Sequence, residues 1–230
     1  MFGTFSFVRL LTFVLGAIGL CWGATVIPAS GTIDNLRYFE TQLLRSKTFT
    51  RKDLSELLSV ASDAVGDCDT DAQEAMLLIE VRLANFALQA GDVVDYDNRL
   101  ASAERRARDL LACAPRRSFV WLLAFSFEVL HGRLNQHAFD LLTMSYETSP
   151  NEGWIAIRRN IVTAPLVLIA PEPIKDKILS EFEQVSTYYP QEAARSYQSV
   201  NEQAQTLLRQ RVGQLGQQSQ KEFWEATTKR

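Results

Sequence analysis

The sequence predicts an all-α protein built from antiparallel helix pairs that follow an N-terminal hydrophobic helix. Apolar residues recur three and four positions apart along most of the chain, whereas the alternation typical of strands is nearly absent. Signals that begin and end helices fall between these periodic segments. The chain has 230 residues, 47% of them hydrophobic and 22% charged, which is typical of a globular protein. Its net charge of −3 gives no electrostatic reason to expect nucleic-acid binding.

The helices are expected to follow one another with short joints. Thr50 and Asp53 form a capping pair ahead of one helix, the acidic residues from Asp69 to Asp71 open another, and Gly91 lies at a joint. We expect helices over residues 33–47, 51–65, 70–90, 94–114, 117–131, 135–148, 151–163, 172–187, 190–212 and 217–228.

Composition divides the chain into three expected regions. Residues 1–30 form an N-terminal hydrophobic segment, residues 31–189 a helical domain, and residues 190–230 a Gln-rich amphipathic helical tail. An apolar stripe runs along the tail at Tyr197, Val200, Ala204, Leu207, Leu208 and Leu215. Such a stripe either packs on the domain or joins two copies of the chain into a homodimer.

The run from Leu10 to Ala29 contains no charged residue. As a helix it would be about 30 Å long, which is enough to cross a bilayer. The alternative is a cleaved signal peptide, with the best cleavage site at Ala29-Ser30-Gly31, because Trp22 and Ile27 disfavour the other sites. We expect an uncleaved transmembrane anchor.

Two signals oppose each other on the orientation of this anchor. Arg9 alone closely precedes the run, whereas three basic residues soon follow it, a bias that favours a cytoplasmic domain. Long domains are nevertheless translocated largely regardless of charge, and two cysteines in the domain suit an oxidising compartment. The balance favours an exported domain.

The two cysteines of the domain are expected to form a disulfide. Cys68 precedes the expected helix 70–90, and Cys113 lies near the end of the helix 94–114. Antiparallel packing of these helices brings both cysteines to one end of the pair. The bond would stabilise the pair by roughly 3–4 kcal/mol. The alternative is two free thiols in a cytoplasmic protein, and no Cys-x-x-Cys spacing supports a redox or zinc site.

Small residues, aromatics and prolines recur at offsets typical of tetratricopeptide repeats. Ala103 lies twelve positions before Pro115, Trp121 lies six after it, and Ala138 lies twelve before Pro150. In such repeats the small residue lets paired helices approach closely, and the proline ends the second helix. These offsets predict a tetratricopeptide-like (TPR-like) array of helix pairs.

The stretches 112–125 (ACAPRRSFVWLLAF) and 141–160 (LLTMSYETSPNEGWIAIRRN) resemble a family of bacterial envelope-associated TPR-like proteins of no established activity. The resemblance covers roughly residues 68–182 and does not include the tail. The uncharged run and the orientation signals lead us to expect a single-pass protein of the bacterial inner membrane with a periplasmic domain. The resemblance implies a place alongside surface-polysaccharide machinery.

The chain carries no recognisable catalytic or metal-binding motif. The segment from Asp67 to Asp71 begins like a calcium loop, but Ala72 and Leu78 stand where that loop requires Gly and Glu. His131 and His137 are the only histidines, and no nucleophile with an oriented base accompanies them. We therefore expect no enzyme activity, no cofactor and no metal.

The most informative candidate for binding is the stretch from Pro150 to Asn160. Asn151 is expected to cap a helix that places Arg158 on the same face as Trp154. A half-buried arginine beside an aromatic ring either holds a carboxylate or phosphate group, or bridges to a neighbouring helix through Glu147 or Glu152. The expected binding residues are Phe119, Trp154, Arg158, Arg159 and Asn160.

These features predict a membrane-anchored adaptor or scaffold that binds protein partners without making or breaking bonds. One alternative is an accessory protein or enzyme of polysaccharide processing that uses Arg158, Arg159 and acidic neighbours. The other alternative is a purely structural dimer joined through the tail.

Overall fold

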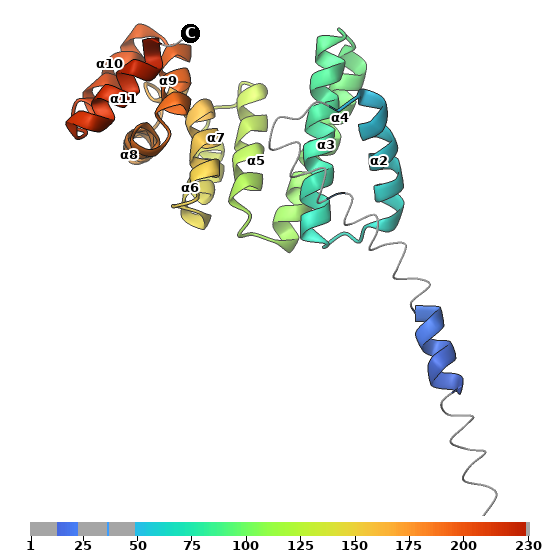
Figure 1. The fold of residues 1–230 in the computed structure, drawn as a ribbon. Helices are drawn as coiled ribbons and strands as arrows, with labels where there is room; N and C mark the ends of the chain where they lie inside the picture. Colours follow the sequence, from blue (N-terminus) through green and yellow to red (C-terminus); the bar gives the residue numbers. More distant parts are fainter. Residues whose placement is uncertain (1–12, 23–35, 37–48, 229–230) are drawn as a thin grey trace, which may run out of the picture. The chain divides into compact units, whose positions relative to one another are not determined.

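The computed structural model describes residues 13–22, 36 and 49–228, and within these residues every regular element is helical (Figure 1). The prediction of an all-α protein is therefore confirmed for this part of the chain. The fold divides between Ala114 and Pro115 into two compact units, here called unit 1 and unit 2.

Three helices make up the described part of unit 1 after residue 49: α2 (Arg51–Ala64), α3 (Thr70–Gln89) and α4 (Val93–Cys113). The predicted capping pair begins α2, because the Thr50 side chain accepts a hydrogen bond from the Asp53 backbone N–H and the Asp53 carboxylate accepts one from Thr50. Asp69 caps α3, since its carboxylate accepts a hydrogen bond from the Ala72 backbone N–H. Gly91, with φ of 71°, allows the tight turn into α4.

Helices α3 and α4 pack along each other as an antiparallel pair. The predicted disulfide joins Cys68, just before α3, to Cys113 at the end of α4, with 5.5 Å between their Cα atoms. The bond therefore closes the open end of the pair, opposite the Gly91 turn.

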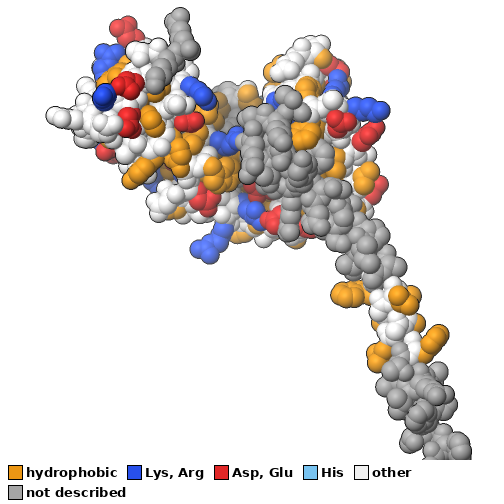
Figure 2. All heavy atoms as spheres, in the orientation of Figure 1, with side chains coloured by type: hydrophobic (Ala, Val, Ile, Leu, Met, Phe, Trp, Pro, Cys, Tyr) orange, Lys and Arg blue, Asp and Glu red, His pale blue; other side chains and the backbone are white. Residues whose placement is uncertain are grey.

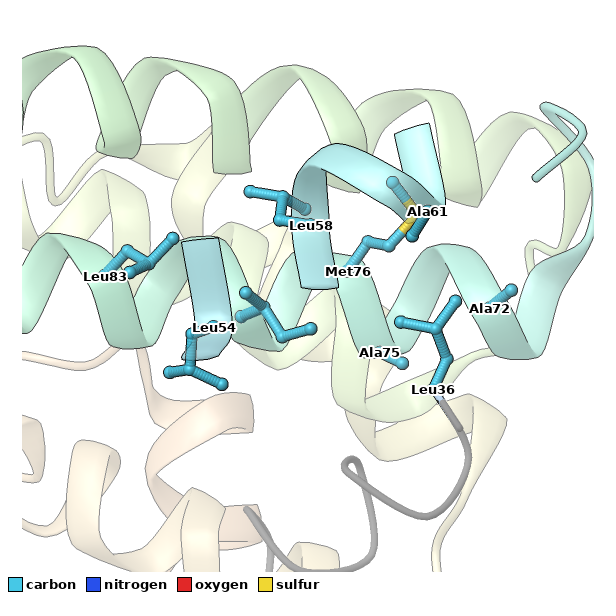
Figure 3. Close-up of a cluster of buried hydrophobic side chains, with 9 residues drawn as sticks. Leu36, Leu54, Leu58, Ala61, Ala72, Ala75, Met76 and Leu83 are labelled. Atoms are coloured by element: carbon cyan, nitrogen blue, oxygen red, sulfur yellow. The ribbon is translucent and has the colours of Figure 1, made fainter. Parts of the chain in front are cut away.

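Figure 3 shows the core of unit 1, where Leu54 and Leu58 of α2 face Met76 and Leu83 of α3. Leu36 is fully buried in the same cluster. The rest of the expected helix 33–47 lies outside the described residues.

Unit 2 contains seven α-helices and a short 3₁₀ helix among its described residues. These are α5 (Ser118–Leu130), α6 (Gln136–Thr148), α7 (Gly153–Thr163), η1 (Ala164–Leu166), α8 (Glu172–Tyr188), α9 (Pro190–Ser199), α10 (Glu202–Val212) and α11 (Gln217–Thr228). Helices α5 and α6 form a second pair around a turn at Gly132, whose φ is 70°.

The single helix expected over residues 190–212 is wrong. The structure has two helices there, because Val200 is extended and Asn201 caps α10 by accepting a 2.9 Å hydrogen bond from the Ala204 backbone N–H. The apolar stripe continues through this break, so hydrophobic periodicity alone does not reveal it. The break allows α9 and α10 to bury separate faces against α8.

The tail expected as a separate region from residue 190 packs within unit 2. Phe223 of α11 is fully buried, and its ring centroid lies 5.9 Å from that of Phe182 and 5.7 Å from that of Tyr197. Tyr197, Ala204 and Leu208 of the predicted stripe are also buried in this unit. The stripe thus contributes to the core of its own chain.

Residues 13–22 are helical, and their large hydrophobic side chains are exposed, as the orange side chains in Figure 2 show. The other residues of the run from Leu10 to Ala29, with the cleavage site considered above, lie outside the described residues. Within the described ranges, no helix combines the length and the apolar character needed to cross a membrane.

Candidate functional site

The candidate site is built on α7, which follows a short joint after α6. The expected cap at Asn151 is wrong: the helix begins one residue later, with Glu152 in the capping position and without a side-chain capping bond in the described structure. Asn151 is instead exposed. Capping rules therefore located the start of α7 but misassigned the residue.

Three of the predicted binding residues meet at the surface of unit 2. The ring centroids of Phe119 and Trp154 are 5.2 Å apart, and the guanidinium carbon of Arg158 lies 5.7 Å from the Phe119 centroid. Phe119 is 5% exposed, whereas Trp154 is 41% exposed and Arg158 is half-buried. We call this cluster the aromatic–arginine patch.

Helix α7 extends the patch with a residue that sequence analysis missed. Ile161 lies seven positions after Trp154 and three after Arg158, so all three share one helical face. Its side chain is 55% exposed. Its spacing from Trp154 and Arg158 was the signal available in the sequence.

Arg159, the next residue along α7, points into the interior and is fully buried. Its Nη2 lies 2.7 Å from Glu181 Oε1 on α8, and its Nε donates a 2.8 Å hydrogen bond to the same oxygen. The charge of Arg159 is therefore neutralised inside unit 2 by a carboxylate 22 positions further along the chain.

The remaining donors of Arg159 are held by α5 and α6. Its Nη1 donates to the Ser145 carbonyl oxygen at 2.7 Å and to Ser118 Oγ at 3.2 Å, and its Nη2 donates to the Ser149 carbonyl oxygen at 3.1 Å. Ser118 and Ser145 also bond to each other, since each hydroxyl donates to the other's carbonyl oxygen. One guanidinium thus links α7 to α5, α8 and the end of α6, beneath the patch.

The structure separates the five predicted binding residues into two groups. Phe119, Trp154 and Arg158 form the surface patch, whereas Arg159 and Asn160 lie below it, 0% and 1% exposed. Arg159 bridges to a neighbouring helix inside unit 2 through Glu181 on α8.

Asn160 differs from Arg159 in its hydrogen bonding. Both polar atoms of its amide are buried and have no hydrogen-bond partner among the described residues.

Burial shifts the ionisation of several groups around α7. It raises the pKa of the Glu181 carboxyl, an effect that the neighbouring Arg159 guanidinium opposes. It also raises the pKa of the Tyr146 phenol strongly, so this hydroxyl is neutral at physiological pH. Burial lowers the pKa of Arg158, but an arginine remains protonated in proteins.

The chemistry available at the patch is recognition. The patch presents the aromatic face of Trp154 and the planar guanidinium of Arg158 on α7. Buried hydrogen bonds of the neighbouring Arg159 hold this helix in place. Across residues 13–22, 36 and 49–228, no group of three or more His, Cys, Asp or Glu side chains is placed to hold a metal ion.

Comparisons of this chain with protein-family models, with curated proteins and with solved structures found no match.

Proposed function

We propose that the protein is a non-catalytic adaptor that binds a protein partner through the aromatic–arginine patch. The observation that supports this most strongly is Trp154, a large aromatic side chain left 41% exposed while its ring packs on a buried phenylalanine. Tryptophan and arginine are the residues that most often dominate the energy of protein interfaces.

The rigidity beneath the patch favours such a role. A side chain that is already ordered loses less conformational entropy on binding. Phe119 supports Trp154 from below, and the Arg159 bonds fix α7 against α5 and α8. The patch is therefore preorganised for binding.

The adaptor would use TPR-like helix pairs as its scaffold. Helices α3 and α4, and α5 and α6, each form a pair around a tight glycine turn. Ala103 and Ala138, the small residues expected at close helix approaches, are both fully buried. These features support a TPR-like organisation within each unit.

We further propose that residues 10–29 anchor the chain in a bacterial inner membrane, with the helical domain in the periplasm. The Cys68–Cys113 disulfide supports export, because disulfides persist in oxidising compartments and are rare in the cytosol. The uncharged run supports the anchor.

The size of the native complex tests the proposal. Wild-type protein, extracted in mild detergent from its own host, is expected to migrate well above the 25.9 kDa of one chain. The double variant Trp154→Ala/Arg158→Ala is expected to migrate as the free chain, while the surface variant Gln210→Ala on α10 keeps the wild-type mobility. A patch variant that stays in the large complex would overturn the proposed interface, provided that circular dichroism shows all variants folded.

A further inference from the structure

A cavity of about 500 Å³ lies in unit 1, where α4 faces the first turn of α3. Its walls carry four charged side chains, from Asp67, Arg105, Arg106 and Asp109, together with the polar side chain of Gln73. We call it the α4 cavity. It shares no residue with the aromatic–arginine patch, which belongs to unit 2.

The charges at the α4 cavity are not paired with one another. Among the described residues, the side chains of Asp67, Arg105 and Asp109 take part in no ion pair and no hydrogen bond. Arg106 forms no ion pair either, and its Nη1 donates to Gln73 Oε1. A pair formed by Arg105 with Asp109 would be weak at such an exposed place, so it could open to receive a ligand. The cavity therefore offers charges of both signs.

These charged groups can be reached from solvent. Asp67, Arg105 and Asp109 are exposed, and Arg106 is half-buried. Of the Arg106 nitrogens, Nε is enclosed and Nη1 is bonded to Gln73, whereas Nη2 is neither enclosed nor hydrogen-bonded within the described structure. A ligand in the cavity can therefore contact Nη2 and the three exposed side chains.

Burial leaves the Arg106 cation short of counter-charge. It lowers the pKa of Arg106 more than any other influence, and the neighbouring Arg105 lowers it further. Glu80 and Asp109 act in the opposite direction, but the Glu80 carboxylate is already paired with Arg99 at 3.2 Å. Since arginine stays protonated in proteins, a further carboxylate at the cavity would stabilise this cation.

The two signs of charge are separated along the cavity. Arg105 and Arg106 are adjacent on α4, and Asp109 follows Arg106 by about one helical turn. Cys113 lies seven positions after Arg106, which corresponds to about 10 Å along the helix. The Asp67 carbonyl oxygen is 3.8 Å from Cys113 Sγ, so Asp67 lies at this second end. The cavity is thus positive at one end and negative at the other.

This separation selects a ligand that carries both charges. An anion would gain the two arginines but would also meet the two aspartates, and a cation would meet the reverse. A neutral ligand would leave all four charges without a partner. A peptide with free termini carries a carboxylate at one end and an ammonium at the other. Three extended residues span about 10 Å, which matches the distance along α4.

We propose that the α4 cavity binds a short peptide whose two termini are free, with its C-terminal carboxylate on Arg105 and Arg106 and its N-terminal ammonium on Asp109 and Asp67. The site lies in unit 1, whereas the patch proposed for the protein partner lies in unit 2. The two proposals therefore stand or fall independently.

Saturation-transfer NMR titrations test the proposal with four probes that differ only at their ends: trialanine, N-acetyl-trialanine, trialanine amide and N-acetyl-trialanine amide. The full chain is kept in an uncharged detergent. Trialanine is expected to bind. Blocking either terminus should weaken binding about tenfold or more, because each block removes charge-assisted hydrogen bonds.

Substitutions of exposed residues connect this preference to the cavity. Arg105→Gln should weaken trialanine binding at least about threefold and reduce the preference for trialanine over its amide. Asp109→Asn should weaken it similarly and reduce the preference over N-acetyl-trialanine. The matched controls are Arg108→Gln and Asp97→Asn, at exposed positions of α4 outside the cavity. They remove the same charges and should bind as the wild type does.

Three outcomes would overturn the proposal. The first is that trialanine receives no saturation from the protein. The second is that either singly blocked peptide binds as tightly as trialanine, which would indicate a site for an anion or a cation alone. The third is that the control variants weaken binding as much as Arg105→Gln and Asp109→Asn, which would indicate a general effect of surface charge.

Discussion

The guanidinium of Arg159 and the carboxylate of Glu181 meet inside unit 2, with 2.7 Å between Nη2 and Oε1. Arg159 is 0% and Glu181 is 6% exposed. Since α7 and α8 carry the two residues, the pair fixes α7, the helix that bears the aromatic–arginine patch, against α8. The proposed binding surface on α7 therefore depends on this buried contact.

Removing Arg159 should destabilise unit 2 far more than removing its neighbour. Arg159→Ala leaves the Glu181 carboxylate buried without its partner, which is expected to lower the free energy of unfolding by about 3–5 kcal/mol. Arg158→Ala should change it by only about 1 kcal/mol, because Arg158 is half-buried rather than fully enclosed in unit 2.

Urea unfolding followed by tryptophan fluorescence measures this difference. Three of the four tryptophans, Trp121, Trp154 and Trp224, belong to unit 2, so the signal reports mainly on that unit. Equal destabilisation by Arg159→Ala and Arg158→Ala would show that the Arg159–Glu181 contact does not hold α7 in place.

The raised pKa of Glu181 predicts a characteristic dependence of stability on pH. A carboxyl whose pKa is higher in the folded state binds its proton more readily there. Its contribution to stability is fully present below the unfolded pKa and is lost as the pH rises through the raised folded pKa. The wild type should therefore become less stable relative to Glu181→Gln as the pH rises from about 4 to about 8.

Urea titrations of both proteins across this range check the prediction. The Gln variant serves as the reference because it cannot titrate at this position, so all other ionisable groups cancel in the comparison. If the wild type instead gains stability relative to the variant with rising pH, the attraction of Arg159 outweighs burial and the pKa of Glu181 is lowered.

Substitution by alanine should lower stability at Asn201 but not at Asn151, although both asparagines lie near the start of a helix. Asn201 caps α10, so Asn201→Ala is expected to cost about 1 kcal/mol of stability. Asn151 does not cap α7, and Asn151→Ala should leave stability nearly unchanged. Thermal unfolding of the two variants provides the comparison, and a similar loss in both would contradict the assigned start of α7.

The disulfide should be a major source of stability in unit 1. Cys68 and Cys113 enclose a sequence separation of 45 residues, and closing a loop of this length is expected to contribute about 4 kcal/mol. Hydrogen exchange followed by mass spectrometry should show faster exchange in peptides from α3 and α4 after Cys68→Ser. Cys21→Ser, which changes the free cysteine, should leave this exchange unaltered.

Local signals explain why most helices could be predicted. Capping residues such as Thr50 and Asp69, and glycines such as Gly91, act on the backbone within a few residues, so the sequence alone identifies them. The break at Val200 escaped prediction because the apolar periodicity continues through it. The capping residue Asn201 was a local signal for this break, and the packing of α9 and α10 against α8 accompanies it.

The sequence could predict only the part of the candidate site that lies on a single helix, α7. Trp154 and Arg158 share a face of α7, which their spacing of four residues reveals. Which of the two arginines is buried, Arg158 or Arg159, depends on Glu181, which lies 22 positions after Arg159 in the sequence. That Tyr146 of α6 and Glu181 of α8 line one cavity likewise depends on how these two helices pack, which no local pattern encodes.

Site-specific photo-crosslinking in the native host tests the proposed interface most directly. Benzoylphenylalanine placed at Ile161, on the α7 face beside Arg158, is expected to form one discrete protein adduct that mass spectrometry identifies. The same probe at Gln210 on α10 should give no such adduct, and Trp154→Ala should reduce the Ile161 adduct strongly, since loss of a central tryptophan typically costs about 2 kcal/mol or more of binding energy. An Ile161 adduct that persists unchanged in Trp154→Ala, or the absence of any adduct at Ile161, would contradict an adaptor that binds through this patch.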